Sequence, residues 1–234
     1  MFIFERDYLK IMRRAHLVAA IDGDTAVRIA AEQTAIQEAA GYLARARFDA
    51  PAIFKDIPAW SVATAYVAGN YVHYEPAVWT AQAYAMGTQL QYTFADGTYI
   101  VESTRLTTPT ETPATMPAAW VRRDLLLGIW KCTGTPVIGT PPIWGSVNWM
   151  QEDPRHRLIV MYVTDIAIWH MLSRTDPSAL PEQRVTRYEQ AIAWLSAVSK
   201  GQVSDPYLPL ISGPGEVPIS GIYVSGHPKQ DFNL

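Results

Sequence analysis

The chain has 234 residues, a mass of 26.1 kDa and a formal net charge of -3. Hydrophobic residues make up 49% and charged residues 18%, which excludes a disordered chain and favours a globular one. The slight negative charge disfavours a protein that grips nucleic acid through its phosphates. A single cysteine, Cys132, excludes an internal disulfide framework and a thiolate metal cluster. Charges interrupt every apolar run, so we expect no signal peptide and no membrane span.

Residues 1–56 are predicted to be helical. Apolar residues between Tyr8 and Leu17 recur at three- and four-residue steps, which is the helical period. Asp24 is placed to cap a second helix, predicted from about Thr25 to Arg47 and rich in alanine and threonine. Small side chains let helix axes approach closely, so we expect this helix to pack against another, from this chain or a neighbour.

Residues 57–150 change character and are predicted to form a small β-rich module. Helical periodicity stops, and six of the eight tryptophans fall in this segment. Asn70–Tyr74 and Tyr99–Val101 have the composition of strands, and Ala95–Thr98 indicates a tight hairpin turn. Two "apolar-Trp-x-small … Pro-x-x-Trp" patterns suggest a degenerate duplication, and we expect two related subunits, from Val78–Ala81 with Pro117–Trp120 and Ile129–Cys132 with Pro141–Trp144.

Residues 151–201 return to helix. Asp153, followed by proline, is predicted to cap a helix over Arg155–Ser173 that is apolar nearly all round and therefore central. Pro181 opens the last helix, which we expect to stop at Lys200-Gly201. The fold class is therefore α+β multidomain: a helical domain of residues 1–56 with 151–201, split by an inserted β-rich module, 57–150.

Residues 202–234 are predicted to be an extended C-terminal arm. They are rich in proline and glycine, yet carry β-branched and aromatic residues that a disordered linker rarely has. We expect the arm to become ordered by lying on a partner, and its contact residues to be Ile222, Tyr223, Val224 and Phe232.

Catalytic constellations are not recognisable in the sequence. The five histidines lack metal-ligand spacing, and no phosphate-binding glycine loop is present. We expect no enzyme activity, no metal and no cofactor. Asp165 stands in the middle of the apolar helix, and a structural ion pair with Arg45, Arg47 or Arg187 is favoured over catalysis.

The aromatic residues of the module allow two interpretations. They form the core of a module with few charges, or some of them line an exposed platform that stacks on sugar rings or on another protein. The candidate platform residues are Trp60, Tyr66, Tyr74, Trp79, Trp120 and Trp130.

Two segments resemble a known family. Thr25–Phe54, an alanine-rich helix leading into Gly-Tyr-Leu, resembles the start of the helical adaptor (head-completion, or head–tail connector) proteins of tailed bacteriophages. Arg157–Ser204 is more closely similar to the paired helices of that family. The matching positions are Pro181, Arg184, Arg187, Tyr188, Ala191, Ile192, Trp194, Leu195 and Gly201.

The resemblance implies a non-enzymatic virion protein of the phage neck, assembled in the host cytoplasm. It would form a ring, expected to be a dodecamer, that docks beneath the portal protein, binds the tail or next neck protein, and continues the DNA channel without specific DNA binding. The residues expected to hold the helical core are Tyr162, Asp165, Trp169, Tyr188, Trp194 and Leu195. The residues expected to form ion pairs within or between subunits are Arg47, Arg184 and Arg187.

The inserted module is similar to small carbohydrate-binding modules of chitinases, through Trp60–Tyr74, Val78–Ala81 and a closing Pro-x-x-Trp. This implies an alternative function, polysaccharide binding or adhesion by a module carried on a helical scaffold. The two functions predict different locations for the protein, at the neck of a virion or on a glycan surface.

Overall fold

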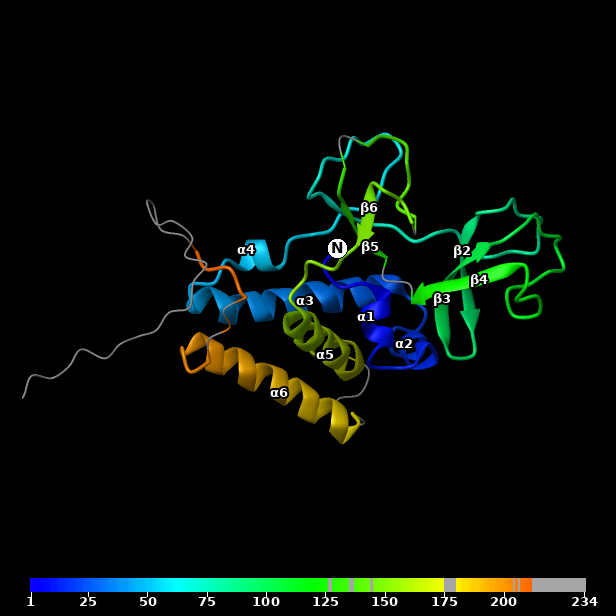
Figure 1. The fold of residues 1–234 in the computed structure, drawn as a ribbon. Helices are drawn as coiled ribbons and strands as arrows, with labels where there is room; N and C mark the ends of the chain where they lie inside the picture. The colour runs from blue at the N-terminus through cyan, green and yellow to red at the C-terminus, as the bar shows by residue number, and fades with distance from the viewer. Residues whose placement is uncertain are drawn as a thin grey trace, which may run out of the picture. The chain divides into compact units, whose positions relative to one another are not determined.

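The computed structural model describes residues 1–125, 128–134, 137–143, 145–174, 180–203, 205 and 207–211. Within these residues the protein is a mixed α+β structure with six helices and two three-stranded antiparallel sheets (Figure 1). The chain divides into two compact units. Residues 2–55 with 155 onward form what we call the helical unit, and Met1 with residues 56–154 forms the β unit.

Three long helices dominate the helical unit: α3 (Thr25–Arg45), α5 (Arg157–Ser173) and α6 (Glu182–Ser199) (Figure 1). Each of them contacts the other two, and α5 also contacts the short helix α1 (Glu5–Leu9). Two further short helices complete the unit, α2 (Arg14–Ala20) and α4 (Ala50–Ile53). On α3 the buried apolar residues recur every fourth position and line one face: Ala31, Ala35, Ala39 and Leu43.

The central helix α5 is buried along most of its length. Its core residues include Ile159, Val163, Ile166 and Met171, each at most 1% exposed. A helix that is apolar on most of its circumference has to be covered on several sides, and α5 is covered by α1, α3 and α6. The expectation of a central helix in this segment therefore matches the packing.

Helix boundaries follow local signals with two exceptions. The Asp24 side chain caps α3 by accepting a hydrogen bond from the Ala26 amide at 2.8 Å. The predicted Asp153 cap is wrong, because His156 caps α5 through a hydrogen bond to the Ile159 amide. The N-terminal helical pattern is divided between α1 and α2, with a turn between Leu9 and Arg14.

The β unit holds the two sheets. One has the strand order β1-β5-β6, formed by Tyr71–His73, Ile129–Cys132 and Trp149–Gln151. The other has the order β2-β3-β4, formed by Gln89–Phe94, Gly97–Ser103 and Trp120–Leu125. The predicted hairpin is present, with Phe94 paired to Gly97 across a two-residue turn. The buried apolar side chains form two clusters, one centred on each sheet, and Ile100 of β3 belongs to the cluster of the β1-β5-β6 sheet.

The start of the predicted arm belongs to the helical unit. Leu208 is 5% exposed and joins the helical core, so this part of the predicted arm contacts the core of its own chain. The predicted arm contacts lie outside the described residues: Ile222, Tyr223, Val224 and Phe232.

Candidate functional site

An aromatic cluster around Tyr188, one of the positions that match the phage family, joins the three long helices. The Tyr188 hydroxyl donates to Glu38 at 3.1 Å, and Nε2 of His170 lies 3.0 Å from the other oxygen of the same carboxylate. The Trp169 ring stacks on Tyr188 with a centroid distance of 4.2 Å and an interplanar angle of 15°. Burial and the Glu38 charge raise the pKa of Tyr188 to about 12. Because the hydroxyl stays protonated, it acts as a hydrogen-bond donor.

Asp165 forms an ion pair with Arg187, whose Nη1 lies 3.5 Å from the carboxylate. Burial raises the pKa of Asp165, and the positive charges of Arg187 and Arg184 only partly oppose it. Arg184 donates to the Ile11 carbonyl at 3.2 Å, and burial lowers its pKa. Of the three arginines considered for Asp165, Arg187 is the partner, whereas the side chain of Arg45 is exposed.

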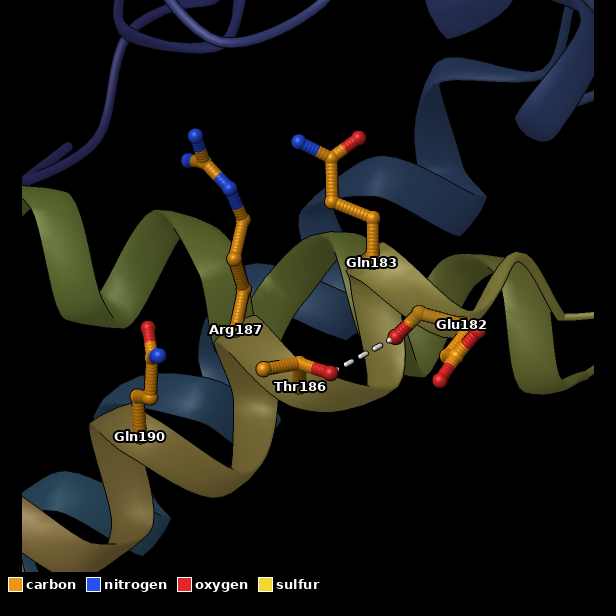
Figure 2. Close-up of a pocket in the computed structure, with 5 residues that line it drawn as sticks. All are labelled: Glu182, Gln183, Thr186, Arg187 and Gln190. Carbon is orange, nitrogen blue, oxygen red and sulfur yellow. Dashed lines mark hydrogen bonds between the residues drawn. The ribbon is translucent and has the colours of Figure 1, made fainter.

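A shallow depression lies on α6, beside the Asp165–Arg187 pair. Its lining residues all come from this helix and are polar: Glu182, Gln183, Thr186, Arg187 and Gln190 (Figure 2). Figure 2 shows their side chains standing side by side, with the Thr186 hydroxyl bonded to the Glu182 carbonyl. Enzyme and cofactor sites are usually enclosed and draw polar groups from several elements. This depression has the character of a polar helix surface.

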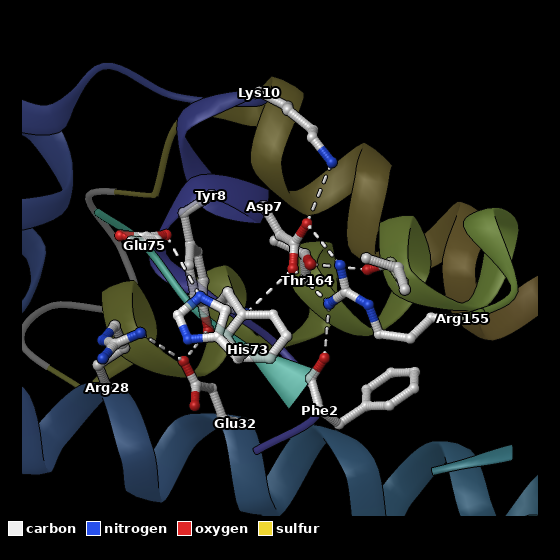
Figure 3. Close-up of polar contacts among 12 residues, drawn as sticks. Phe2, Asp7, Tyr8, Lys10, Arg28, Glu32, His73, Glu75, Arg155 and Thr164 are labelled. Atoms are coloured by element: carbon white, nitrogen blue, oxygen red, sulfur yellow. Dashed lines mark hydrogen bonds and ion pairs between the residues drawn. The ribbon is translucent and has the colours of Figure 1, made fainter. Parts of the chain in front are cut away.

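A buried ion pair fixes the N-terminal segment to the start of α5. Nη1 of Arg155 lies 2.6 Å from Asp7, and the same atom donates to the Phe2 carbonyl at 2.6 Å (Figure 3). Asp7 also accepts from Lys10 at 3.1 Å and from the Phe4 amide at 3.0 Å. Burial acts to raise the pKa of Asp7, but the hydrogen bonds and charge of Arg155 outweigh it and lower the pKa.

A second buried network lies where α1 meets α3. Glu32 accepts a hydrogen bond from the Tyr8 hydroxyl at 3.0 Å and pairs with Arg28 at 3.1 Å (Figure 3). Burial raises the pKa of Glu32 and, together with the Glu32 charge, raises the pKa of Tyr8. Sequence reasoning missed both networks, because only the folded chain brings their members together.

The solvent-facing side of α3 carries no charged side chain between its ends. We call this the outer face of α3, and its exposed residues are Ala26, Ile29, Ala30, Gln33, Thr34, Gln37, Gly41 and Ala44. The charged side chains in this stretch point elsewhere, since Arg28 and Glu32 are buried and Glu38 faces Tyr188. An added Cβ at Gly41 would meet no atom within 4 Å. Exposed helix faces normally carry charges, so this one is typical of a covered face.

Residues 207–211 lie along the segment that links α3 to α4. The Asp49 amide donates to the Pro209 carbonyl at 2.8 Å, and the Ile211 amide donates to the Arg47 carbonyl at 2.8 Å. The contribution of Arg47 here comes from its backbone, while its side chain is exposed. Leu208 points into the core, whereas Tyr207 is 84% exposed.

The platform prediction is wrong for three of its six aromatic residues. Tyr66, Trp120 and Trp130 are 5%, 4% and 1% exposed, so their rings form the cores of the sheets and cannot stack on a ligand. The other three are half-buried and lie against those cores: Trp60, Tyr74 and Trp79.

In the described part of the chain, no group of three or more His, Cys, Asp or Glu side chains is arranged to hold a metal ion. Among the helices described, none is both long and apolar enough to cross a membrane. Cys132 is buried in the core of the β1-β5-β6 sheet. No family model, curated protein or solved structure matches the chain.

Proposed function

We propose that this chain is a structural protein of a tailed-phage virion, a connector adaptor whose copies form a ring beneath the portal. The ring joins the head to the tail or next neck protein and continues the DNA channel. In this proposal the helical unit forms the ring wall, and the inserted β unit decorates the neck. The protein has no enzymatic task.

The observation that carries the proposal is the position of the residues that resemble the adaptor family. Arg187 pairs with Asp165, Tyr188 binds Glu38, and Trp194 lies 5.1 Å from the Tyr162 ring. Ala191 and Leu195 are fully buried. These positions are used to hold α6 against α5 and α3, which gives the resemblance a physical basis in the packing of the helical unit.

The outer face of α3 supports the assembly part of the proposal. A ring requires each subunit to present surfaces to its neighbours, and charged residues are depleted where such surfaces are fully buried. The small residues Ala30, Thr34 and Gly41 would let a neighbouring backbone approach closely. The net charge of -3 suits a channel that DNA passes without adhering.

The first experiment is electron microscopy of particles from the source organism, labelled with an antibody against residues 57–150. Label at the junction of capsid and tail is expected. Label at fibre tips or on cell walls would contradict the proposal and favour the alternative below.

A variant pair tests the ring surface. Thr34→Arg with Gln37→Arg places two charges on the outer face of α3, where both side chains are exposed. We expect an unchanged melting temperature and loss of incorporation into particles. The matched control is Thr93→Arg, an exposed position of the β unit, which should incorporate normally. Normal incorporation of the double variant would show that this face is not an interface.

The second candidate function is polysaccharide binding by the β unit. It is favoured by two half-buried edge-to-face pairs, Trp60 with Tyr74 at 5.4 Å and Trp79 with Tyr92 at 5.8 Å. Aromatic rings at a surface offer an apolar face to sugar rings. A pull-down on insoluble chitin, with Trp60→Ala and Trp79→Ala, tests it. If both variants bind chitin as strongly as the unchanged protein, these aromatic pairs are not a polysaccharide-binding site.

A further inference from the structure

We infer that the β unit is a nested duplication, in which one small module is inserted into the central hairpin of another copy of itself. The outer copy comprises residues 58–74 and 129–151, and the inner copy comprises residues 77–92 and 100–122. The inference rests on hydrogen bonds, ring contacts and backbone angles that recur at equivalent positions.

The same pair of backbone bonds ties the start of each copy to its first strand. In the outer copy the Trp60 amide donates to the His73 carbonyl at 2.9 Å, and the His73 amide donates to the Pro58 carbonyl at 2.8 Å. The inner copy repeats both bonds, from Trp79 to Gln91 at 2.9 Å and from Gln91 to Ala77 at 2.9 Å. Each contact is an isolated parallel bridge beside an otherwise antiparallel sheet, which is an uncommon feature to meet twice.

The same tyrosine–tryptophan pair forms the centre of each copy. Tyr66 accepts a hydrogen bond from the Ser61 amide at 2.8 Å and meets the Trp149 ring edge-on at 5.4 Å. The Trp149 indole donates to the Thr140 carbonyl, nine residues earlier. The inner copy has the corresponding contacts. The Thr80 amide donates to the Tyr84 hydroxyl, and the Tyr84 and Trp120 rings meet edge-on at 5.7 Å. The Trp120 indole donates to the Glu111 carbonyl, also nine residues earlier.

A glycine turn precedes the first strand in both copies. Gly69 has a φ of 90°, and its amide donates to the Cys132 carbonyl at 2.8 Å. Gly87 has a φ of 82°, and its amide donates to the Ser103 carbonyl at 2.8 Å. These backbone angles favour glycine, so the turn conformation explains why this residue type recurs.

Residue identity follows the structural correspondence. With the contacts above as the guide, the strand registers bring identical residues to equivalent places. The identical pairs are Trp60 and Trp79, Ala65 and Ala83, Tyr66 and Tyr84, Gly69 and Gly87, Tyr74 and Tyr92, Ile129 and Ile100, Thr133 and Thr104, and Trp149 and Trp120. A three-stranded sheet does not by itself require these residue types, so a shared origin of the two copies is the simplest account.

The nesting differs from the duplication expected from the sequence. The expected pairing of Trp130 with Trp79 is wrong, because Trp130 is equivalent to Val101. Trp130 pairs with Val72 in the outer copy, and Val101 pairs with Leu90 in the inner copy. In the inner copy the first two strands are joined by Ala95-Asp96, whereas in the outer copy the inner copy itself occupies the connection. Insertion is tolerated at such a hairpin tip because the two chain ends there are close together.

Nesting predicts that the two copies open separately. The full-length chain with Trp149→Ala loses the central ring of the outer copy, and its counterpart with Trp120→Ala loses that of the inner copy. We expect hydrogen exchange of Trp149→Ala to show at least about 100-fold lower protection in β1, β5 and β6, with β2–β4 changed less than about threefold. Trp120→Ala should chiefly expose β2–β4, because opening the insert affects the outer copy through a longer loop and through the contact of Ile100 with the outer cluster, and leaves the other contacts of that cluster in place.

An equal loss of protection in both sheets of Trp149→Ala would overturn the inference, because it would show one cooperative unit. An excision variant keeps the test decisive if that substitution prevents folding. In it, residues 75–127 are replaced by Ala-Asp, so that the outer copy receives the turn of the inner one. We expect β1, β5 and β6 to keep their protected amides. Unprotected amides in all three strands would likewise reject nested copies.

Discussion

The ion pair between Asp7 and Arg155 lends itself to a strong test of how the helical unit holds together. Both side chains are almost completely buried, at 1% and 2% exposure, and they join the N-terminal segment to the chain just before α5. Arg155→Met keeps an unbranched side chain of comparable length but removes the guanidinium. Asp7 would retain Lys10, which is itself 63% exposed, and the Phe4 amide.

The expected loss is about 3–5 kcal/mol of unfolding free energy, the range for removing one partner of a buried ion pair. Two guanidinium nitrogens of Arg155 contact Asp7, at 2.6 and 3.3 Å, and the Phe2 carbonyl loses a donor as well. Since domains of this size are stable by about 5–15 kcal/mol, the variant should approach the limit of folding. Asp7→Asn should cost less, because the amide still accepts hydrogen bonds.

The measurement is urea denaturation of the full-length chain, followed by circular dichroism at the helical band. Arg14→Met is the matched control, because Arg14 pairs with Glu5 at 3.0 Å while the two side chains are 67% and 48% exposed. An exposed pair contributes about 0–1 kcal/mol. Equal shifts for Arg155→Met and Arg14→Met would refute the assignment of Arg155 as a buried anchor.

Three further predictions concern the helical unit. Burial raises the pKa values of Asp165 and Glu32 in the folded state, so the free energy of unfolding should rise as the pH falls from 7 through those values. Asp165→Asn should flatten this pH dependence. Urea midpoints measured between pH 7 and 4 test it. Leu208→Ala should cost about 2–5 kcal/mol in thermal melts, since the side chain joins the core. Gly201→Ala should destabilise by about 1 kcal/mol at its φ of 69°, whereas Gly41→Ala, with open space around it, should stabilise by about 0.5–1 kcal/mol. Unchanged melting temperatures in both glycine variants would contradict the opposite effects expected for Gly201→Ala and Gly41→Ala.

Local signals in the sequence predicted much of the secondary structure. The Asp24 cap, the apolar run of α5, the proline before α6 and the turn at Ala95-Asp96 each act over a few neighbouring residues. Such signals are readable without knowledge of the fold, because their energetics involve only adjacent backbone groups.

Features that depend on distant partners could not be predicted in this way. Arg155 and Asp7 are 148 residues apart in the sequence, with residues 56–154 of the β unit between them, so the pair has no spacing that a sequence pattern could show. The outer copy of the nested module is interrupted by its own duplicate, which hides the correspondence of Trp60 with Trp79. The exposure of each tryptophan could not be predicted from the sequence either. Strand register decides whether a tryptophan in a small module lies in the core or at the surface, and here Trp120 is buried whereas Trp60 is half-buried.

The helical unit separates residues that specify the fold from residues available for assembly. Tyr188 and Leu195 hold the three helices together, so changing them should lower stability without altering what a folded molecule binds. Thr34 and Tyr207 are exposed and contribute little to the core, so changing them should leave stability intact and alter only contacts with other molecules. The phage resemblance lies mainly in the residues that hold the helices together. It therefore predicts the helical packing more directly than it predicts the function. The proposed ring depends on the exposed residues. Surface variants that fold normally are therefore the ones that test the proposed function.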